Sequence, residues 1–177
     1  MVRAPRSRIG LISDTHGLLR PAALDFLQGC DAIVHSGDIG NAQILEDLAR
    51  IAPLVAIRGN NDLDWAVSLN DTEFMDVQNI RLYVIHDAND LRPDVRVQDV
   101  HIIVSGHSHR PSLREKAGVF YINPGSAGPR RFTLPVAIGE LLIQGGAVSA
   151  RLVNLTSGQA IASQEYLRAD LLDRHSI

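Results

Sequence analysis

Two histidines, His107 and His109, stand two residues apart in the segment SGHSHRP, directly after the apolar run VHIIV. Imidazole nitrogens are common ligands of transition metals, so the pair could belong to a metal site. Taken alone, however, it is at least as well explained by two solvated side chains. Residues two apart on an extended segment share a face, so each histidine could reach one ion of a metal pair. A metal site would need further ligands from other segments.

Four other polar clusters follow apolar runs in the same way: SDTHG after RIGLI, SGDIG after DAIVH, RGNND after PLVAI and HDAND after RLYVI. In open α/β sheets the carboxyl ends of the strands form a common edge where ligands bind, so clusters far apart in sequence converge there. We therefore expect one group of two carboxylates, one amide oxygen and four imidazoles: Asp14, Asp38, Asn60, His16, His86, His107 and His109.

This set of oxygen and nitrogen ligands without a thiolate suits Mn, Fe, Zn, Ni or Mg. Seven ligands are too many for one tetrahedral ion, but they suit two ions that share a carboxylate. Two ions about 3.5–4 Å apart form the usual clamp for displacement at phosphorus. The residues therefore predict a binuclear metal centre that acts on a phosphate ester.

The elements that must position these residues alternate along the first part of the chain. Apolar runs at 8–13, 31–37 and 53–59 predict strands, and two helical segments separate them. The first helix has Pro21 near its start and Gly29 at its end, and Asn41 is a plausible N-cap of the second. This β-α-β-α-β order implies parallel strands with crossover helices.

The rest of the chain is richer in strands. The expected elements are paired strands around the Gln78-Asn79 turn, a buried strand before Ser105, strands at 119–123, 133–143 and 147–155, and an amphipathic helix at 163–175. Gly145-Gly146 is expected to form a hairpin turn. We expect one domain over residues 1–177, with an α/β core and a second, more antiparallel strand layer.

Composition narrows the function classes. The formal net charge of −3 and the pI near 6.1 argue against an extended nucleic-acid surface. The single Cys30 excludes an intramolecular disulfide and a cysteine-rich zinc module, and it fits a reducing cytoplasm. The basic start leads into no apolar signal region, and no apolar run approaches the ~20 residues of a membrane span. We expect a cytoplasmic protein without a membrane partner; a homo-oligomer is possible.

The motifs DTHG, GD, GNND and GHSH, followed by NPGS at Asn123–Ser126, together resemble the calcineurin-like metallophosphoesterases. The match runs from about Arg8 to about Gly125. The short length and the NPGS element resemble the small YfcE-type phosphodiesterase branch. The resemblance implies an α/β fold, a four-layer α-β-β-α sandwich of two mixed β-sheets flanked by helices.

The resemblance also implies a ligand set and a mechanism. One metal would be held by Asp14, His16, Asp38 and His109, and the other by Asp38, Asn60, His86 and His107. Asp38 would bridge the ions, and a hydroxide between them would attack the phosphorus of a small phosphodiester. The centre would carry a net charge of roughly +1, attractive to that substrate. Asp38, Asn60 and His107 are the expected catalytic residues, and Mn is the expected metal, with Ni, Fe, Zn or Mg as alternatives.

Two positions depart from the family pattern. Many relatives carry a histidine where this chain has Asn61, which cannot protonate a leaving group; Asp62 is one possible replacement acid. The HGH of many relatives is HDA here, so Asp87 and Ala88 change the substrate-facing surroundings of His86. Asn61 and Arg130 are the expected substrate contacts.

Several residues have less reactive roles in this interpretation. His35 is expected to orient a ligand from behind, His101 to be structural and His175 to be solvated. Gly17, Gly37, Gly59 and Gly106 are expected to allow sharp turns beside the metals. The main alternative function is a protein-interaction scaffold of the Vps29 type, which shares the fold. A dinucleotide-binding domain is disfavoured, because GDIGNA lacks the GxGxxG spacing.

Overall fold

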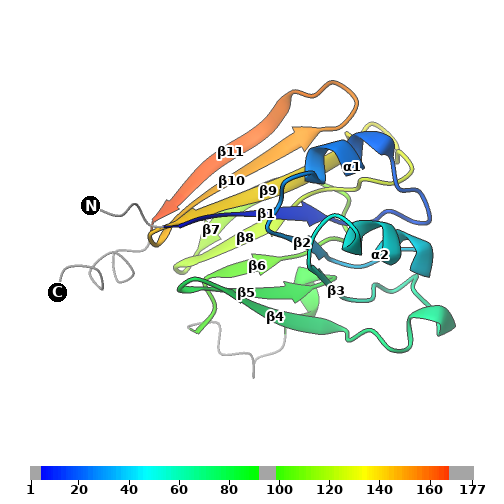
Figure 1. Cartoon of the computed structure of the whole chain (residues 1–177), viewed down its shortest axis with the longest axis horizontal. Coiled ribbons are helices and arrows are strands. Elements are labelled where there is room, and N and C mark those ends of the chain that lie inside the picture. Colours follow the sequence, from blue (N-terminus) through cyan, green and yellow to red (C-terminus); the bar gives the residue numbers. More distant parts are fainter. Residues whose placement is uncertain (1–4, 92–98, 168–177) are drawn as a thin grey trace.

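The computed structural model describes residues 5–91 and 99–167, which form two packed β-sheets (Figure 1). The larger sheet has six strands in the order β11-β10-β9-β1-β2-β3. Their bounds are β1 Arg6–Ile12, β2 Ala32–His35, β3 Leu54–Ala56, β9 Ala137–Gln144, β10 Ala147–Asn154 and β11 Ala160–Leu167. None of the described helices combines the length and the apolar character needed to cross a membrane.

The first three strands are parallel and are joined by two helices, as the sequence predicts. Helix α1 (Pro21–Leu27) begins with its proline at the first helical position. Helix α2 (Ala42–Ala49) is capped by Asn41, whose side-chain oxygen accepts a hydrogen bond from the Ile44 backbone N–H at 3.3 Å. Both helices lie side by side along one face of the six-stranded sheet (Figure 1), where their apolar residues share a core with β1 and β2.

The smaller sheet has five strands in the order β4-β5-β6-β8-β7. Their bounds are β4 Thr72–Val77, β5 Ile80–Ile85, β6 Ile102–Val104, β7 Ser112–Lys116 and β8 Val119–Asn123. The central strands β5, β6 and β8 are parallel, and the edge strands β4 and β7 are antiparallel to their neighbours. The main core lies between the two sheets and includes Leu11, Val84, Val104 and Leu141.

The predicted fold class is confirmed: two mixed sheets pack face to face, with helices outside. The two outer layers are unequal. In the part of the chain that the structure describes, the outer face of the five-stranded sheet carries a small cluster that includes Tyr83, Ile85 and Val100. The 3-10 helix η2 (Ala88–Asp90) leads into Leu91, which packs against this cluster.

Two expectations about the second half of the chain are wrong, and one strand was missed. The antiparallel strands β9–β11 do not form a layer of their own; they extend the sheet that holds β1, because β9 pairs with β1. The strand predicted from residue 133 begins only at Ala137, after Pro135. The charged edge strand β7 was not predicted.

The tail helix predicted over 163–175 is also wrong in its first part, because residues up to Leu167 belong to β11. Pairing with β10 overrides the helical pattern: Val148 lies opposite Tyr166, and the Tyr166 ring stacks on Phe120 at 5.3 Å between centroids. The rest of the predicted helix, together with His175, lies outside the described residues.

Candidate metal centre

The predicted convergence of the polar clusters is confirmed, since the loops that follow β1, β2, β3, β5 and β6 meet at one edge of the sandwich. Ligand atoms of Asp14, His16 and His109 all lie within 4.8 Å of one another. The same limit holds for a second group formed by Asp14, Asp38 and His86. Residues from opposite ends of the stretch 14–109 therefore contribute to one site.

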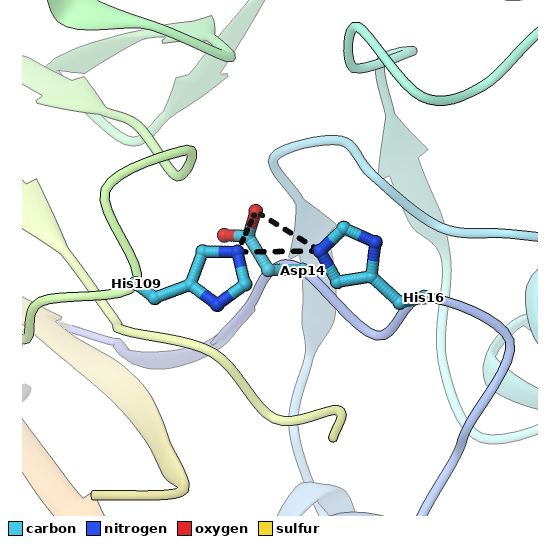
Figure 2. A group of neighbouring side chains, drawn as sticks. All are labelled: Asp14, His16 and His109. Atoms are coloured by element: carbon cyan, nitrogen blue, oxygen red, sulfur yellow. Dashed lines mark hydrogen bonds and ion pairs between the residues drawn. The ribbon is translucent and has the colours of Figure 1, made fainter. Parts of the chain in front are cut away.

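In the first cluster, the side chains of Asp14, His16 and His109 point toward a common centre (Figure 2). The Nε2 atoms of the two histidines are 3.2 Å apart, and His109 Nε2 lies 3.3 Å from Asp14 Oδ1. Asp14 is completely buried, and its Oδ2 accepts hydrogen bonds from the Ser13 hydroxyl and the His107 backbone N–H. Its Oδ1 has no hydrogen-bond partner among the described residues.

A second cluster consists of Asn60, His86 and His107. Its Asn60 Oδ1 lies 3.1 Å from His86 Nε2 and 3.1 Å from His107 Nδ1. On the far side of its ring, His86 Nδ1 is 2.7 Å from the Ser36 carbonyl oxygen, which can only accept. The Nδ1 atom therefore carries a proton and donates it to this bond. The Nε2 atom is thereby aimed into the site, in the orientation that a metal-ligating histidine requires.

Asp38 lies between the two clusters. Its Oδ2 is 3.7 Å from His16 Nε2 and 3.4 Å from His86 Nε2. The backbone and side-chain N–H groups of Asn61 donate to the two carboxylate oxygens, at 2.9 and 2.6 Å. Burial raises the pKa of Asp38, but the neighbouring His86 ring and the two hydrogen bonds from Asn61 outweigh it and hold that pKa far below its usual range. The carboxyl group is therefore ionised at neutral pH.

The donor set fits divalent cations. Ligand oxygens of two buried carboxylates lie within 4.8 Å of each other, and one carboxylate oxygen has no donor among the described residues. Two imidazole Nε2 atoms are in hydrogen-bond range of one another. Burial lowers the pKa of His16 and outweighs the opposite effects of Asp38 and Asp14, which keeps the ring in its neutral, ligating form. A cation would satisfy the orphaned oxygen and both rings together.

The backbone of the site is unusual. Asp14, His16, Asp38, His107 and His109 all have positive φ, between 44° and 63°, a region that non-glycine residues rarely adopt. The expectation that His107 and His109 share one face of an extended segment is therefore wrong. The left-handed turn sends the buried His109 to the first cluster and the exposed His107 to the second.

His35 supports the ligands from behind, as expected. It is fully buried, and its Nδ1 accepts a hydrogen bond from the Gly37 N–H. The Thr15 hydroxyl donates to the Ile39 carbonyl, so it must accept from His35 Nε2. This fixes a neutral tautomer that joins the Thr15 loop to the Gly37 loop. The expected structural role of His101 is also seen, since its Nδ1 accepts from the Arg81 N–H at 2.9 Å.

Asp62, which the sequence suggested as a substitute for the missing acid at Asn61, is engaged in holding the loops together. Both of its oxygens are occupied as acceptors, from the backbone N–H groups of Ile39, Gly40 and Gly59 at 2.8–3.0 Å. It is 5% exposed and clamps the loop after β2 to the loop after β3. Its oxygens are thus taken up by contacts within the loops, which is the position of a structural residue.

The glycines act in two ways. Gly17 and Gly37 have positive φ, as turn residues do. Gly59 and Gly106 have ordinary φ, and their role is close approach: a side chain on Gly59 would meet the Asp38 carboxylate, and one on Gly106 would meet Ser13 and Asp14.

Of the two residues predicted to contact substrate, Asn61 lies at the metal centre, whereas no contact joins Arg130 to the ligand residues among the described interactions. The Asn61 amide is engaged with Asp38, while Arg130 is exposed on the loop after β8. The next residue, Arg131, is close enough to His16 to lower the pKa of that ring. Substrate contact by Asn61 and Arg130 stays a prediction.

Sequence reasoning missed a pocket of about 890 Å³ that opens beside Asn60, His86 and His107. It also missed the contact of Asp87 Oδ2 with His107 Nε2, at 3.6 Å. The departure from HGH to HDA was the available signal for that contact.

A two-sheet sandwich with histidines, carboxylates and an amide at its loop edge defines the class of metallophosphoesterase folds. The family model of the calcineurin-like phosphoesterase superfamily domain matches residues 8–143, and the chain belongs to this family. A probable metallophosphoesterase of Methanothermobacter thermautotrophicus is 29% identical over 157 residues, covering 82% of this chain and 91% of the relative. A phosphodiesterase of Methanocaldococcus jannaschii is 23% identical over 137 residues, covering 67% and 82%.

Solved structures agree on the fold. The phosphoesterase YfcE of E. coli superposes with a TM-score of 0.69 at 22% identity, covering 90% of this chain and 99% of its own. Vps29 of Entamoeba histolytica in complex with Zn²⁺ superposes with a TM-score of 0.70 at 24% identity, covering 89% and 97%. Both catalytic and sorting proteins therefore share this architecture.

Proposed function

We propose that the chain is a metal-dependent phosphodiesterase with a binuclear centre. The observation that carries the proposal is the position of Asp38, whose Oδ2 lies within 4 Å of one histidine from each cluster. One carboxylate so placed can be shared by two ions. The name of the Methanocaldococcus jannaschii relative supports a diester rather than a monoester as substrate.

Each residue has a role in this proposal. Asp14, His16, Asp38 and His109 would hold one ion, and Asp38, Asn60, His86 and His107 would hold the other. When bound, such ions would supply a lowered pKa for water and positive charge for the phosphoryl oxygens. Asn61 orients Asp38, while Ser36 and His35 fix the rings and loops behind the ligands.

The proposal extends to metal and compartment. Nitrogen and oxygen ligands without thiolate favour Mn, with Ni, Fe, Zn and Mg as alternatives. The single cysteine, which is buried and unpaired, favours the cytoplasm.

The test is hydrolysis of methyl 4-nitrophenyl phosphate, an activated diester, and of 4-nitrophenyl phosphate, the matched monoester. Protein stripped with chelator is resupplied with Mn, Mg, Ni or Zn in separate reactions. We expect metal-dependent turnover with preference for the diester. Asp38→Ala and His107→Ala should each reduce kcat/KM by at least about 100-fold, the scale of losing a main transition-state contact. Asp25→Ala, an exposed carboxylate on α1, is the matched control and should change nothing.

The Vps29-type scaffold is the second candidate, favoured by the solved neighbours of that name. Since one of them is a zinc complex, metal binding alone does not distinguish the two functions. Stoichiometric metal binding without turnover of either ester would support the scaffold and contradict the enzyme.

A further inference from the structure

The pocket of about 890 Å³ beside the second cluster has no role in holding the metals. Asn60, His86 and His107 form part of its wall, and the rest comes from the loop before β4, from β4 and β5, and from the loop after β5. A group esterified to a phosphate at the second cluster can extend into this space. The volume of this pocket lies in the range of sites that bind drug-sized ligands, so the pocket is large enough for a nucleoside.

One wall of the pocket presents an aromatic face. Phe74 lies on the edge strand β4, and its side chain remains 52% exposed. Its register partner on β5 is the buried Tyr83, and the two ring centroids are 4.8 Å apart at an interplanar angle of 44°. Tyr83 therefore supports the Phe74 ring from within the sheet. The Arg81 guanidinium also approaches this ring, with Cζ 5.9 Å from its centroid. The part of the ring that remains exposed can stack on a flat partner.

The charges of the pocket favour an uncharged occupant. Arg58 and Asp71 form an ion pair, with Nε and Oδ1 2.5 Å apart. The other carboxylates of the lining are Asp87 and Asp90, so carboxylates outnumber guanidinium groups by three to one. Asn70 and Thr72 offer neutral polar groups in the same wall. A second phosphate in this pocket would meet net negative charge.

We propose that this pocket binds the nucleoside of a nucleoside phosphodiester, with its base stacked on Phe74, and disfavours a nucleoside that carries a further phosphate. The inference rests on the proposed function and names its substrate class. In the reaction, water oxygen bonds to phosphorus while the bond from phosphorus to the leaving oxygen breaks. The nucleoside keeps its own ester bond and leaves as the nucleoside monophosphate.

The experiment compares two diesters with the same leaving group, thymidine 5′-(4-nitrophenyl phosphate) and methyl 4-nitrophenyl phosphate, on the metal-loaded protein. We expect the nucleoside ester to have the higher kcat/KM. Phe74→Ala should lower that preference by about 5- to 100-fold, the range of base–aromatic stacking, and leave the methyl ester unaffected. Phe74→Tyr should retain the preference. Phe132→Ala removes a 92% exposed ring outside the pocket and should leave the preference intact.

A third ester tests the charge argument. The same nucleoside ester with an added 3′-phosphate should be hydrolysed at least about 10-fold less efficiently, and Asp90→Asn should narrow that gap. If the protein hydrolyses the methyl ester but shows no nucleoside preference, or if Phe74→Ala affects both diesters equally, the pocket inference is wrong while the proposed function stands. If neither diester is hydrolysed with any metal, the proposed function itself fails.

Discussion

His35 shows how a single buried side chain organises the centre without touching a ligand. Its two ring nitrogens hold Thr15 and Gly37, which precede His16 and Asp38 by one residue each. Burial lowers the pKa of His35 to about 4, against the partly opposing effect of nearby carboxylates. The neutral tautomer is therefore the form that keeps the two ligand loops in register.

This histidine should make the protein sensitive to acid. The unfolded chain binds a proton on His35 near pH 6.5, whereas the folded chain binds it only near pH 4. The contribution of neutral His35 to the free energy of unfolding is therefore fully present above pH 6.5. It is lost as the pH drops from 6.5 to 4, by up to about 3 kcal/mol. Urea unfolding at a series of pH values, in the presence of chelator, measures this change in the free energy of unfolding. His35→Gln, which does not titrate, should lose less stability between pH 7 and pH 4.5; equal losses in both proteins would contradict this role.

At the scale of elements, the site depends on loops that are joined to one another as well as to the sheet. Asp62 accepts hydrogen bonds from Ile39, Gly40 and Gly59, and thereby holds the loop that carries Asp38 against the loop that carries Asn60. Asn61 adds a second link, from its amide to Asp38. The short strands β2 and β3 thus end in one connected unit.

Asp62→Asn tests whether this residue is a clamp or an acid. In the asparagine an NH2 group replaces one accepting oxygen, so at least one backbone N–H loses its acceptor. We expect a loss of about 1–3 kcal/mol in the free energy of unfolding and weaker metal binding. At saturating metal, most of the diester hydrolysis should return. Denaturant unfolding and metal titration measure the two effects, with the exposed Asp64→Asn as control. Abolished turnover with unchanged stability would instead identify Asp62 as an acid.

The sequence predicts much of this arrangement, because strand ends and ligand types are local features. The apolar runs before Asp14, Asp38 and Asn60 predict their common edge, and the parallel order follows from the intervening helices. The left-handed turn at His107 and the pocket beside it were not predictable in this way. They depend on contacts between loops, such as the His107 N–H to Asp14, that no local pattern contains. The charged strand β7 escaped prediction because its alternating apolar signal is weak, and it forms through pairing with β8.

At the scale of the whole molecule, the end of the six-stranded sheet that begins β1 is held by a charged network. Glu140 on β9 is 4% exposed and accepts from Arg8 Nε at 2.6 Å and from Arg151 Nε at 2.7 Å. Both guanidinium groups also lie over the Phe26 ring of α1, at 5.3 and 6.0 Å. The network therefore joins three neighbouring strands to the helix layer.

Glu140→Gln should lower the free energy of unfolding by about 1–3 kcal/mol, because buried hydrogen bonds to charged groups are lost while the shape is kept. Turnover of a diester at saturating metal should stay within about twofold, since Glu140 lies outside the ligand loops. Asp47→Asn breaks an exposed ion pair with Arg50 on α2 and should cost under about 1 kcal/mol. Comparable losses in both variants, by urea unfolding, would contradict the importance assigned to the network.

The positive φ of Asp14, His16, Asp38, His107 and His109 has a consequence for how such a site can change over time. Glycine, asparagine and aspartate enter the left-handed region at little cost, whereas β-branched residues are strongly disfavoured there. A variant without metal-binding histidines would therefore keep its loops most easily with asparagine or glycine at these positions. Valine, isoleucine or threonine at these positions would disturb the backbone itself, so the permitted routes away from metal binding are few.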